Sequence, residues 1–248
     1  MTRFLNFFFM QCILAARSKI ALFWSFGYPA AMLLLMLSVF GGMNKAGPNA
    51  SDPRLLTVTG VFVITIMSGG IFALATVLPA DFATGVYERL KLTDLKRFEV
   101  ILALMLRQFV IIALGAILVM GGAKLIFSVT PHGDFASVLF LTTIGSIVSC
   151  SMGILVANLC PRPAAATAVA NVIFLMMLFL SGSTFPKAFF PAWLTAGAQI
   201  LPASHLFDLL ASQLYDGESL ADNFKSLSIL LAMCGVLMIA AVKTFKWK

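Results

Sequence analysis

Long apolar runs alternate along the chain with short polar stretches that are rich in glycine, proline or charge. A helix needs about 20 mainly apolar residues to cross the hydrocarbon core of a bilayer. By this measure we predict six membrane-spanning helices, at residues 20–40, 55–78, 98–120, 135–159, 164–180 and 224–242. The expected fold class is an all-α polytopic membrane protein, in which residues 1–248 form one transmembrane domain.

Composition supports a membrane protein and argues against several other classes. Hydrophobic residues make up 60% of the chain, the mean hydropathy is +1.00 and only 11% of residues are charged, whereas about a quarter of a soluble protein is charged. The formal net charge of +7 does not indicate nucleic-acid binding, because Lys and Arg in membrane proteins mainly mark the loops on the cytosolic side. No nucleic-acid partner is therefore predicted. The four cysteines form no Cys-x-x-Cys pair, so neither a disulfide framework nor a metal site is predicted.

The basic residues predict which side of the membrane each loop faces. With a cytosolic N-terminus, eleven of the 17 Lys and Arg residues fall on the inner side, five fall on the outer side and Arg107 lies within the third span. Cytosolic loops usually carry the excess of Lys and Arg. We therefore expect a multi-pass protein of the cytoplasmic (inner) membrane, with both termini in the cytosol.

Residues 1–19 contain an apolar run that is too short to span the membrane. Arg3 precedes this run, and Arg17 and Lys19 follow it. A secretory signal peptide has a similar pattern, but its cleavage would leave Arg17 and Lys19 at the outer face. An amphipathic helix in the inner interface fits the pattern, and a frayed start of the first span is the alternative.

The segment at residues 181–222 is too apolar for a solvated loop, and prolines divide it into short pieces of about ten residues. Pieces of that length cannot cross a bilayer, so we predict re-entrant helices in the outer leaflet. Trp193 fits the interfacial preference of aromatic residues. The residues that mark this segment are Phe185, Pro186, Pro191, Trp193 and Pro202.

A short charged stretch lies between the second and third spans. Six of the eleven residues at 87–97 are charged, and the predicted orientation places them in a cytosolic loop at residues 79–98. A compact amphipathic segment that two spans hold at the membrane face is suited to receive force from a soluble partner. An ordinary basic loop, retained by the same charge bias, is the alternative.

The order of these elements resembles the permease subunit of a type-2 ABC exporter, the transmembrane subunit of a bacterial ABC transporter. The shared features are the interfacial helix, Arg17 ahead of a first span with Pro29, the loop after the second span and the re-entrant segment before the last. The resemblance implies a coupling helix that docks on a separate ATPase through Tyr87, Glu88, Arg89, Leu92, Thr93, Leu95 and Arg97. Leu92 and Leu95 are three residues apart and would share one helix face.

The chain holds no Gly-x-x-x-x-Gly-Lys-Ser/Thr sequence, so the nucleotide-binding machinery of an ATP-driven transporter would lie elsewhere. We therefore expect no catalytic residue, no cofactor and no enzyme activity in this chain. The resemblance implies that ATP and Mg bind to partner ATPase subunits. It also implies a second permease, either another copy or a paralogue, because six spans make half of the usual transmembrane unit.

Aromatic and polar residues within the spans are candidates for a substrate path. Arg107 is costly inside a membrane and is a functional residue by default, although it can also snorkel to the headgroups; Glu99 is an imperfect partner for it. The resemblance implies that the first, second and fifth spans flank the path. The candidates are Phe26, Phe62, Phe72, Arg107, Asn171 and Phe174, and a packed or lipid-facing side chain is the alternative for each.

Small residues predict where spans approach one another closely. Gly145, Ser149 and Gly153 recur every four residues and give the fourth span a small face for helix packing. In the second span, Ser68-Gly69-Gly70 either loosens the helix or admits a neighbour.

The resemblance implies an exporter, which we expect to move an amphiphile by alternating access. Such a substrate is a drug, lipid, peptide or glycan-linked lipid carried out of the cytoplasm or the inner leaflet. An ion-coupled carrier or channel is one alternative, although Arg107 is the only clear ionisable residue within a predicted span. A non-transporting assembly or immunity subunit of the same fold is another. His132 and His205 belong to no catalytic motif, so an intramembrane enzyme is not predicted.

Overall fold

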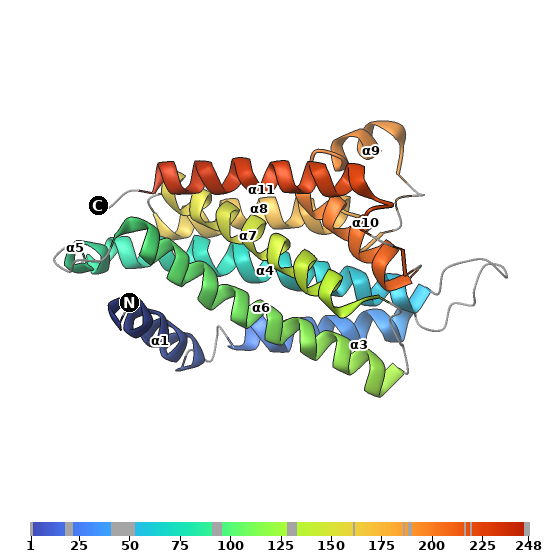
Figure 1. Cartoon of the computed structure of the whole chain (residues 1–248), viewed down its shortest axis with the longest axis horizontal. Coiled ribbons are helices and arrows are strands. Elements are labelled where there is room, and N and C mark those ends of the chain that lie inside the picture. Colours follow the sequence, from blue (N-terminus) through green and yellow to red (C-terminus); the bar gives the residue numbers. More distant parts are fainter. Residues whose placement is uncertain are drawn as a thin grey trace.

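The computed structural model describes residues 2–17, 22–40, 53–90, 96–127, 133–160, 162–185, 187, 190–215, 217–218 and 220–245. These residues form a bundle of helices, and no strand occurs among them (Figure 1). The long helices are α4 (Pro53–Ala83), α6 (Arg97–Phe127), α7 (Phe135–Leu159), α8 (Pro163–Leu180) and α11 (Phe224–Thr244). The shorter elements are α1 (Thr2–Arg17), the π-helix η1 (Phe23–Gly27), α3 (Tyr28–Phe40), α5 (Val86–Leu90), α9 (Ala192–Ala198) and α10 (Pro202–Tyr215).

The all-α polytopic fold is confirmed. Helices α4, α6, α7, α8 and α11 are long and apolar enough to cross a membrane, and the described part of the first predicted span forms a shorter apolar helix at Ser25–Val39. The ends of α7 are those predicted. Helix α4 continues to Ala83 and α6 to Phe127, beyond the predicted residues 78 and 120, because isolated polar residues such as Asp81 and Lys124 do not end a helix.

The π-helix η1 lies directly before α3, whose second residue is Pro29. Proline has no N–H to donate, and its ring collides with the carbonyl group four residues earlier in a regular α-helix. A π-turn widens the helix at that point and accommodates the ring. The sequence Phe23–Gly27 followed by Tyr28-Pro29 thus explains why the first apolar segment changes its helical register.

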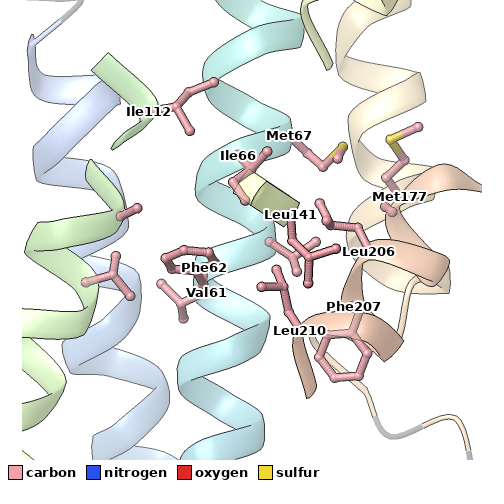
Figure 2. Packing of buried hydrophobic residues seen from close by; sticks show 14 of the residues in the cluster. Val61, Phe62, Ile66, Met67, Ile112, Leu141, Met177, Leu206, Phe207 and Leu210 are labelled. Atoms are coloured by element: carbon pink, nitrogen blue, oxygen red, sulfur yellow. The ribbon is translucent and has the colours of Figure 1, made fainter. Parts of the chain in front are cut away.

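Helix α4 is the centre of the bundle. It packs against α3 and α6 on one side and against α7, α8 and α10 on the other. Figure 2 shows Phe62, Ile66 and Met67 of α4 among buried side chains that include Leu141 of α7 and Leu206 of α10. Lipid tails are as apolar as these side chains, so close packing rather than removal of apolar surface from water holds such helices together in a membrane.

Helices α4 and α7 approach each other closely, and this approach depends on glycine. A Cβ atom added to Gly153 would lie 2.8 Å from the carbonyl oxygen of Gly70, and one added to Gly70 would collide with Ser149. Gly145 lies against Leu206 and Ile66 in the same way. The predicted small face of the fourth span is therefore a packing face, and Gly70 admits this neighbour.

The segment at 181–222 contains α9 and α10. Helix α10 has 14 residues, more than the pieces of about ten that the prolines predict, because Pro202 is its first residue and proline is tolerated there. Its side chains Leu206, Leu209 and Leu210 are buried, and α10 packs against α4, α7 and α11. Whether α9 and α10 dip into the outer leaflet stays a prediction.

The short helices α5 and α9 mark the two ends of the bundle. Figure 1 shows α5 beside the C-terminal end of α11, with α1 nearby, and α9 at the opposite end. We call these the α5 end and the α9 end. A second cluster of buried apolar side chains fills the α5 end, with Phe7 of α1, Leu78 of α4, Ile101 of α6, Ile154 of α7 and Phe245 after α11 among its members.

Candidate functional site

The α5 end carries the stretch that the sequence predicts to couple to an ATPase. Helix α4 ends at Ala83, where the Thr84 N–H and hydroxyl both donate to the carbonyl oxygen of Ala80 at 3.1 Å. Gly85 follows with φ of +68°, a left-handed conformation that favours glycine. The chain thereby turns into α5, where the Arg89 N–H donates to the Gly85 carbonyl oxygen at 3.2 Å.

Tyr87 holds α5 against the bundle. Only 1% of Tyr87 is exposed, and its ring centroid lies 4.9 Å from that of Phe82 and 5.8 Å from that of Phe245. We call these three rings the aromatic cluster. Burial raises the pKa of Tyr87, the negative charge of Asp81 raises it further, and Arg107 opposes both effects. The cluster connects α5 to the end of α4 and the end of α11.

The neighbouring charged residues have the opposite placement. Glu88 and Arg89 on α5 are exposed, as are Lys96 and Arg97 at the start of α6. Leu92, Thr93 and Leu95 lie outside the described residues. In the described part of residues 87–97, the Tyr87 ring is therefore buried against the bundle, while the charged side chains are exposed.

Arg107 lies deeper at the α5 end and is 5% exposed. Its Nη1 donates to Oε1 of Gln11 on α1 at 3.0 Å, while its Nε has no hydrogen-bond partner among the described residues. Asp81 and Tyr87 interact with it electrostatically. Burial raises the pKa of Cys12, next to Gln11, and Arg107 opposes that shift. We call Arg107, Gln11 and Asp81 the polar junction; a hydrogen bond joins α6 to α1 there, and Asp81 of α4 acts on Arg107 through its charge.

Glu99, the partner considered from the sequence, has another role. Its Oε2 accepts a hydrogen bond from the backbone N–H of Lys96 at 2.8 Å, which caps the start of α6. Sequence reasoning missed Gln11, Asp81 and Phe245. Gln11 is a polar residue within the apolar run of residues 4–16, and Asp81 is an acidic residue near the end of a predicted span, so both carried a signal.

The predicted substrate-path residues do not form one group. Phe72 of α4 and Phe174 of α8 meet edge to face, with ring centroids 5.0 Å apart. Phe62 is buried in the core (Figure 2), Phe26 is half-buried in η1 and Asn171 is exposed on α8. Arg107 belongs to the polar junction. Their roles in transport stay predictions.

The predicted marker residues of the outer segment lie at the α9 end, except Pro186, which is outside the described residues. The Phe185 ring stacks on that of Phe179 with centroids 6.0 Å apart. Pro191 precedes α9, Trp193 in α9 is 74% exposed, and Pro202 begins α10.

An ion pair at this end was not predicted. Nζ of Lys187 lies 2.6 Å from Oδ1 and 2.7 Å from Oδ2 of Asp208 on α10. It fastens the stretch before α9 to α10, although a partly exposed pair contributes only about 0–1 kcal/mol. No group of three or more His, Cys, Asp or Glu side chains that could hold a metal occurs in the described part of the chain.

The bundle defines the class of protein as a multi-pass helical membrane protein. Residues 4–215 match the family described as ABC-2 type transporter, and since this match covers most of the chain, the protein belongs to that family. It is thus a permease subunit of an ABC transporter rather than the ATPase, and the family implies an ABC ATPase subunit as its partner. Comparison with curated proteins finds no match.

Proposed function

We propose that this permease subunit exports an amphiphilic substrate, driven by ATP and Mg that bind to separate ATPase subunits. The observation that carries the proposal is the build of α5, where exposed Glu88 and Arg89 lie next to the buried anchor Tyr87. A docking segment needs an accessible, charged surface to select a partner. It also needs a firm attachment to the spans that must move.

The contacts at the α5 end suggest how force reaches the spans. A push on α5 acts on Tyr87, whose ring contacts Phe82 at the end of α4 and Phe245 at the end of α11. Arg107 of the polar junction interacts electrostatically with Tyr87, and it donates a hydrogen bond from α6 to Gln11 of α1. One displacement of α5 would therefore act on four helices and drive alternating access.

The exposed face of α8 supports a second permease, either a copy or a paralogue. Asn171 is exposed on this face, between apolar residues that include Val172 and Leu175. An amide that faces hydrocarbon lacks hydrogen-bond partners, which is costly. A neighbouring permease or a path between the two permeases would give Asn171 partners. Phe72 and Phe174 contact each other and would line such a path only after the helices that carry them move apart.

We place the protein in the cytoplasmic membrane with the α5 end in the cytosol. The excess of Lys and Arg predicted for the cytosolic side supports this orientation. Arg89, Lys96 and Arg97 are exposed near α5, where an ATPase in the cytosol could reach them.

Copurification tests the proposal. The tagged chain is extracted from its native host in mild detergent, and the proteins bound to it are identified. We expect a stoichiometric ATPase that is lost from the double variant Glu88→Arg/Arg89→Glu, which keeps the net charge. Lys225→Glu, an exposed charge reversal in α11 at the α9 end, is the control and should retain it.

Two results would count against the proposal. If several gentle extractions gave no ATPase, an ion-coupled carrier or an assembly subunit would become the better function. If the ATPase bound the double variant normally, docking would lie outside α5.

The direction of transport is tested separately. Uptake of substrate into inverted membrane vesicles is measured with and without ATP.

A further inference from the structure

An apolar cavity of about 480 Å³ lies on the side of the bundle opposite α3 and is separate from the polar junction. Helices α8 and α11 both pack against α7, and side chains of all three helices line it. The stretch from Ile200 to Pro202, which leads from α9 into the start of α10, adds to the wall. Its volume is within the range of about 300–1,000 Å³ that is usual for ligand pockets.

The cavity has a buried floor and an open mouth. Met177 on the floor is 1% exposed, whereas Val236 at the mouth is 67% exposed, and Met176 and Ile200 are also exposed. Both α8 and α11 are apolar enough to cross a membrane. Around the single chain, the mouth therefore opens to an apolar surrounding rather than to water.

The chemistry of the lining selects the ligand. The lining side chains are Met, Ile, Leu, Val, Ala and Pro, so a hydroxyl or charged group inside would find no side-chain partner and would be costly to bury. Four of them are methionines, Met152, Met176, Met177 and Met233. Methionine is flexible and polarizable, and it adapts to ligands of varied shape.

We propose that this cavity holds one hydrocarbon chain of a membrane lipid, which enters between α8 and α11 from the bilayer while its headgroup stays outside. The ligand is a resident lipid and not the transported substrate. The predicted substrate-path residues Phe72 and Phe174 contact each other and are not among the residues that line the cavity. The lipid site is therefore proposed in addition to the export function and does not rest on it.

Photolabelling of the full chain tests the site. The protein is reconstituted in phosphatidylcholine vesicles with a small fraction of phosphatidylcholine that carries a diazirine at the end of one acyl chain. Labelled residues are identified by mass spectrometry. Surface lipid can reach Ile239, which is exposed on α11, but it cannot reach Met177 or the equally buried Met67. We expect several-fold more label on Met177 than on Met67.

A filling variant shows whether the label enters through the cavity. Ala232 lines the cavity and is exposed, so Ala232→Phe places a ring in the mouth. We expect a several-fold loss of label at Met177 with unchanged label at Ile239. The control Leu231→Phe changes the adjacent exposed residue outside the lining and should leave both unchanged. Should Ala232→Phe not fold, Val236→Phe is measured in the same way.

Three results would overturn the inference. The first is label at Met177 no higher than at Met67. The second is label at Met177 that survives Ala232→Phe. The third is an unlabelled Met177 together with disulfide-linked dimers of Val236→Cys, which would show that a second copy of the chain covers the cavity.

Discussion

Arg107 is a charged side chain inside the bundle. Among the described residues, the side-chain amide of Gln11 is its hydrogen-bond partner. Nη1 donates to Gln11 at 3.0 Å, while Asp81 contributes through its charge without forming an ion pair within 4.0 Å among the described residues. A buried charge that loses its partner costs more than the interaction itself contributes. Gln11 therefore contributes to stability mainly by giving the buried charge of Arg107 a hydrogen-bond partner.

This dependence can be measured with a double-mutant cycle. We expect Gln11→Leu to lower the free energy of unfolding in detergent by about 1.5–3 kcal/mol, since a hydrogen bond to a charged group is lost. Adding Arg107→Leu to Gln11→Leu should recover part of that loss. Leu14→Ala on the exposed face of α1 is the control. Strict additivity of the two changes would contradict the coupling.

At Tyr87, substitutions can distinguish the contribution of the ring from that of the hydroxyl. Its hydroxyl is buried and has no hydrogen-bond partner among the described residues, while its ring makes the aromatic contacts. We expect the free energy of unfolding of Tyr87→Phe to lie within about 0.5 kcal/mol of that of the parent protein. For Tyr87→Ala we expect the free energy of unfolding to fall by about 3–5 kcal/mol, because a cavity replaces the ring. Denaturation in detergent measures both, and a large loss in Tyr87→Phe would mean that the hydroxyl has a partner.

At the scale of elements, the backbones of α4 and α7 meet where side chains are absent. Gly153 lies against the carbonyl oxygens of Gly70 and Ile71, so a methyl group there must separate two helices rather than displace one flexible side chain. Gly235 in α11 has no atom within 4 Å of an added Cβ. The two glycines therefore make a matched pair for the same substitution.

We expect Gly153→Ala to destabilise the protein by about 1–3 kcal/mol through overpacking. Gly235→Ala should be neutral or stabilising by up to about 1 kcal/mol, because alanine favours the helix. The stability of both variants is measured by thermal unfolding, with size-exclusion chromatography used to detect the protein that stays folded. Equal effects at the two sites would show that helix propensity, and not the contact between α4 and α7, controls the result.

At the scale of the whole molecule, the sequence predicted the spans because a bilayer allows few solutions. A helix must satisfy its own backbone and present about 20 apolar residues, and the run at 135–159 therefore gave the ends of α7 correctly. Helix ends near single polar residues such as Asp81 were less certain, since water, lipid and protein neighbours decide them. The length of α10 was also missed, because prolines mark where helices start as well as where they stop.

The site was predicted in part. Charge density marked residues 87–97, and the exposed Glu88 and Arg89 agree with a surface role, but burial of Tyr87 depends on Phe245 at the far end of the chain. Gln11 and Arg107 are likewise 96 residues apart, and their contact requires α1 to pack along α6. No local pattern encodes such pairs, so they appear only when the helices are placed together.

The glycine contact between α4 and α7 also limits how the molecule can move. Two backbones in direct contact have no layer of side chains that could change rotamer and let one slide past the other. We expect α4 and α7 to travel as one rigid body during any change of shape. Sliding motion is then left to interfaces with flexible side chains, such as the methionines around the apolar cavity. A displacement of α5 that reaches the end of α4 would therefore carry α7 along with it.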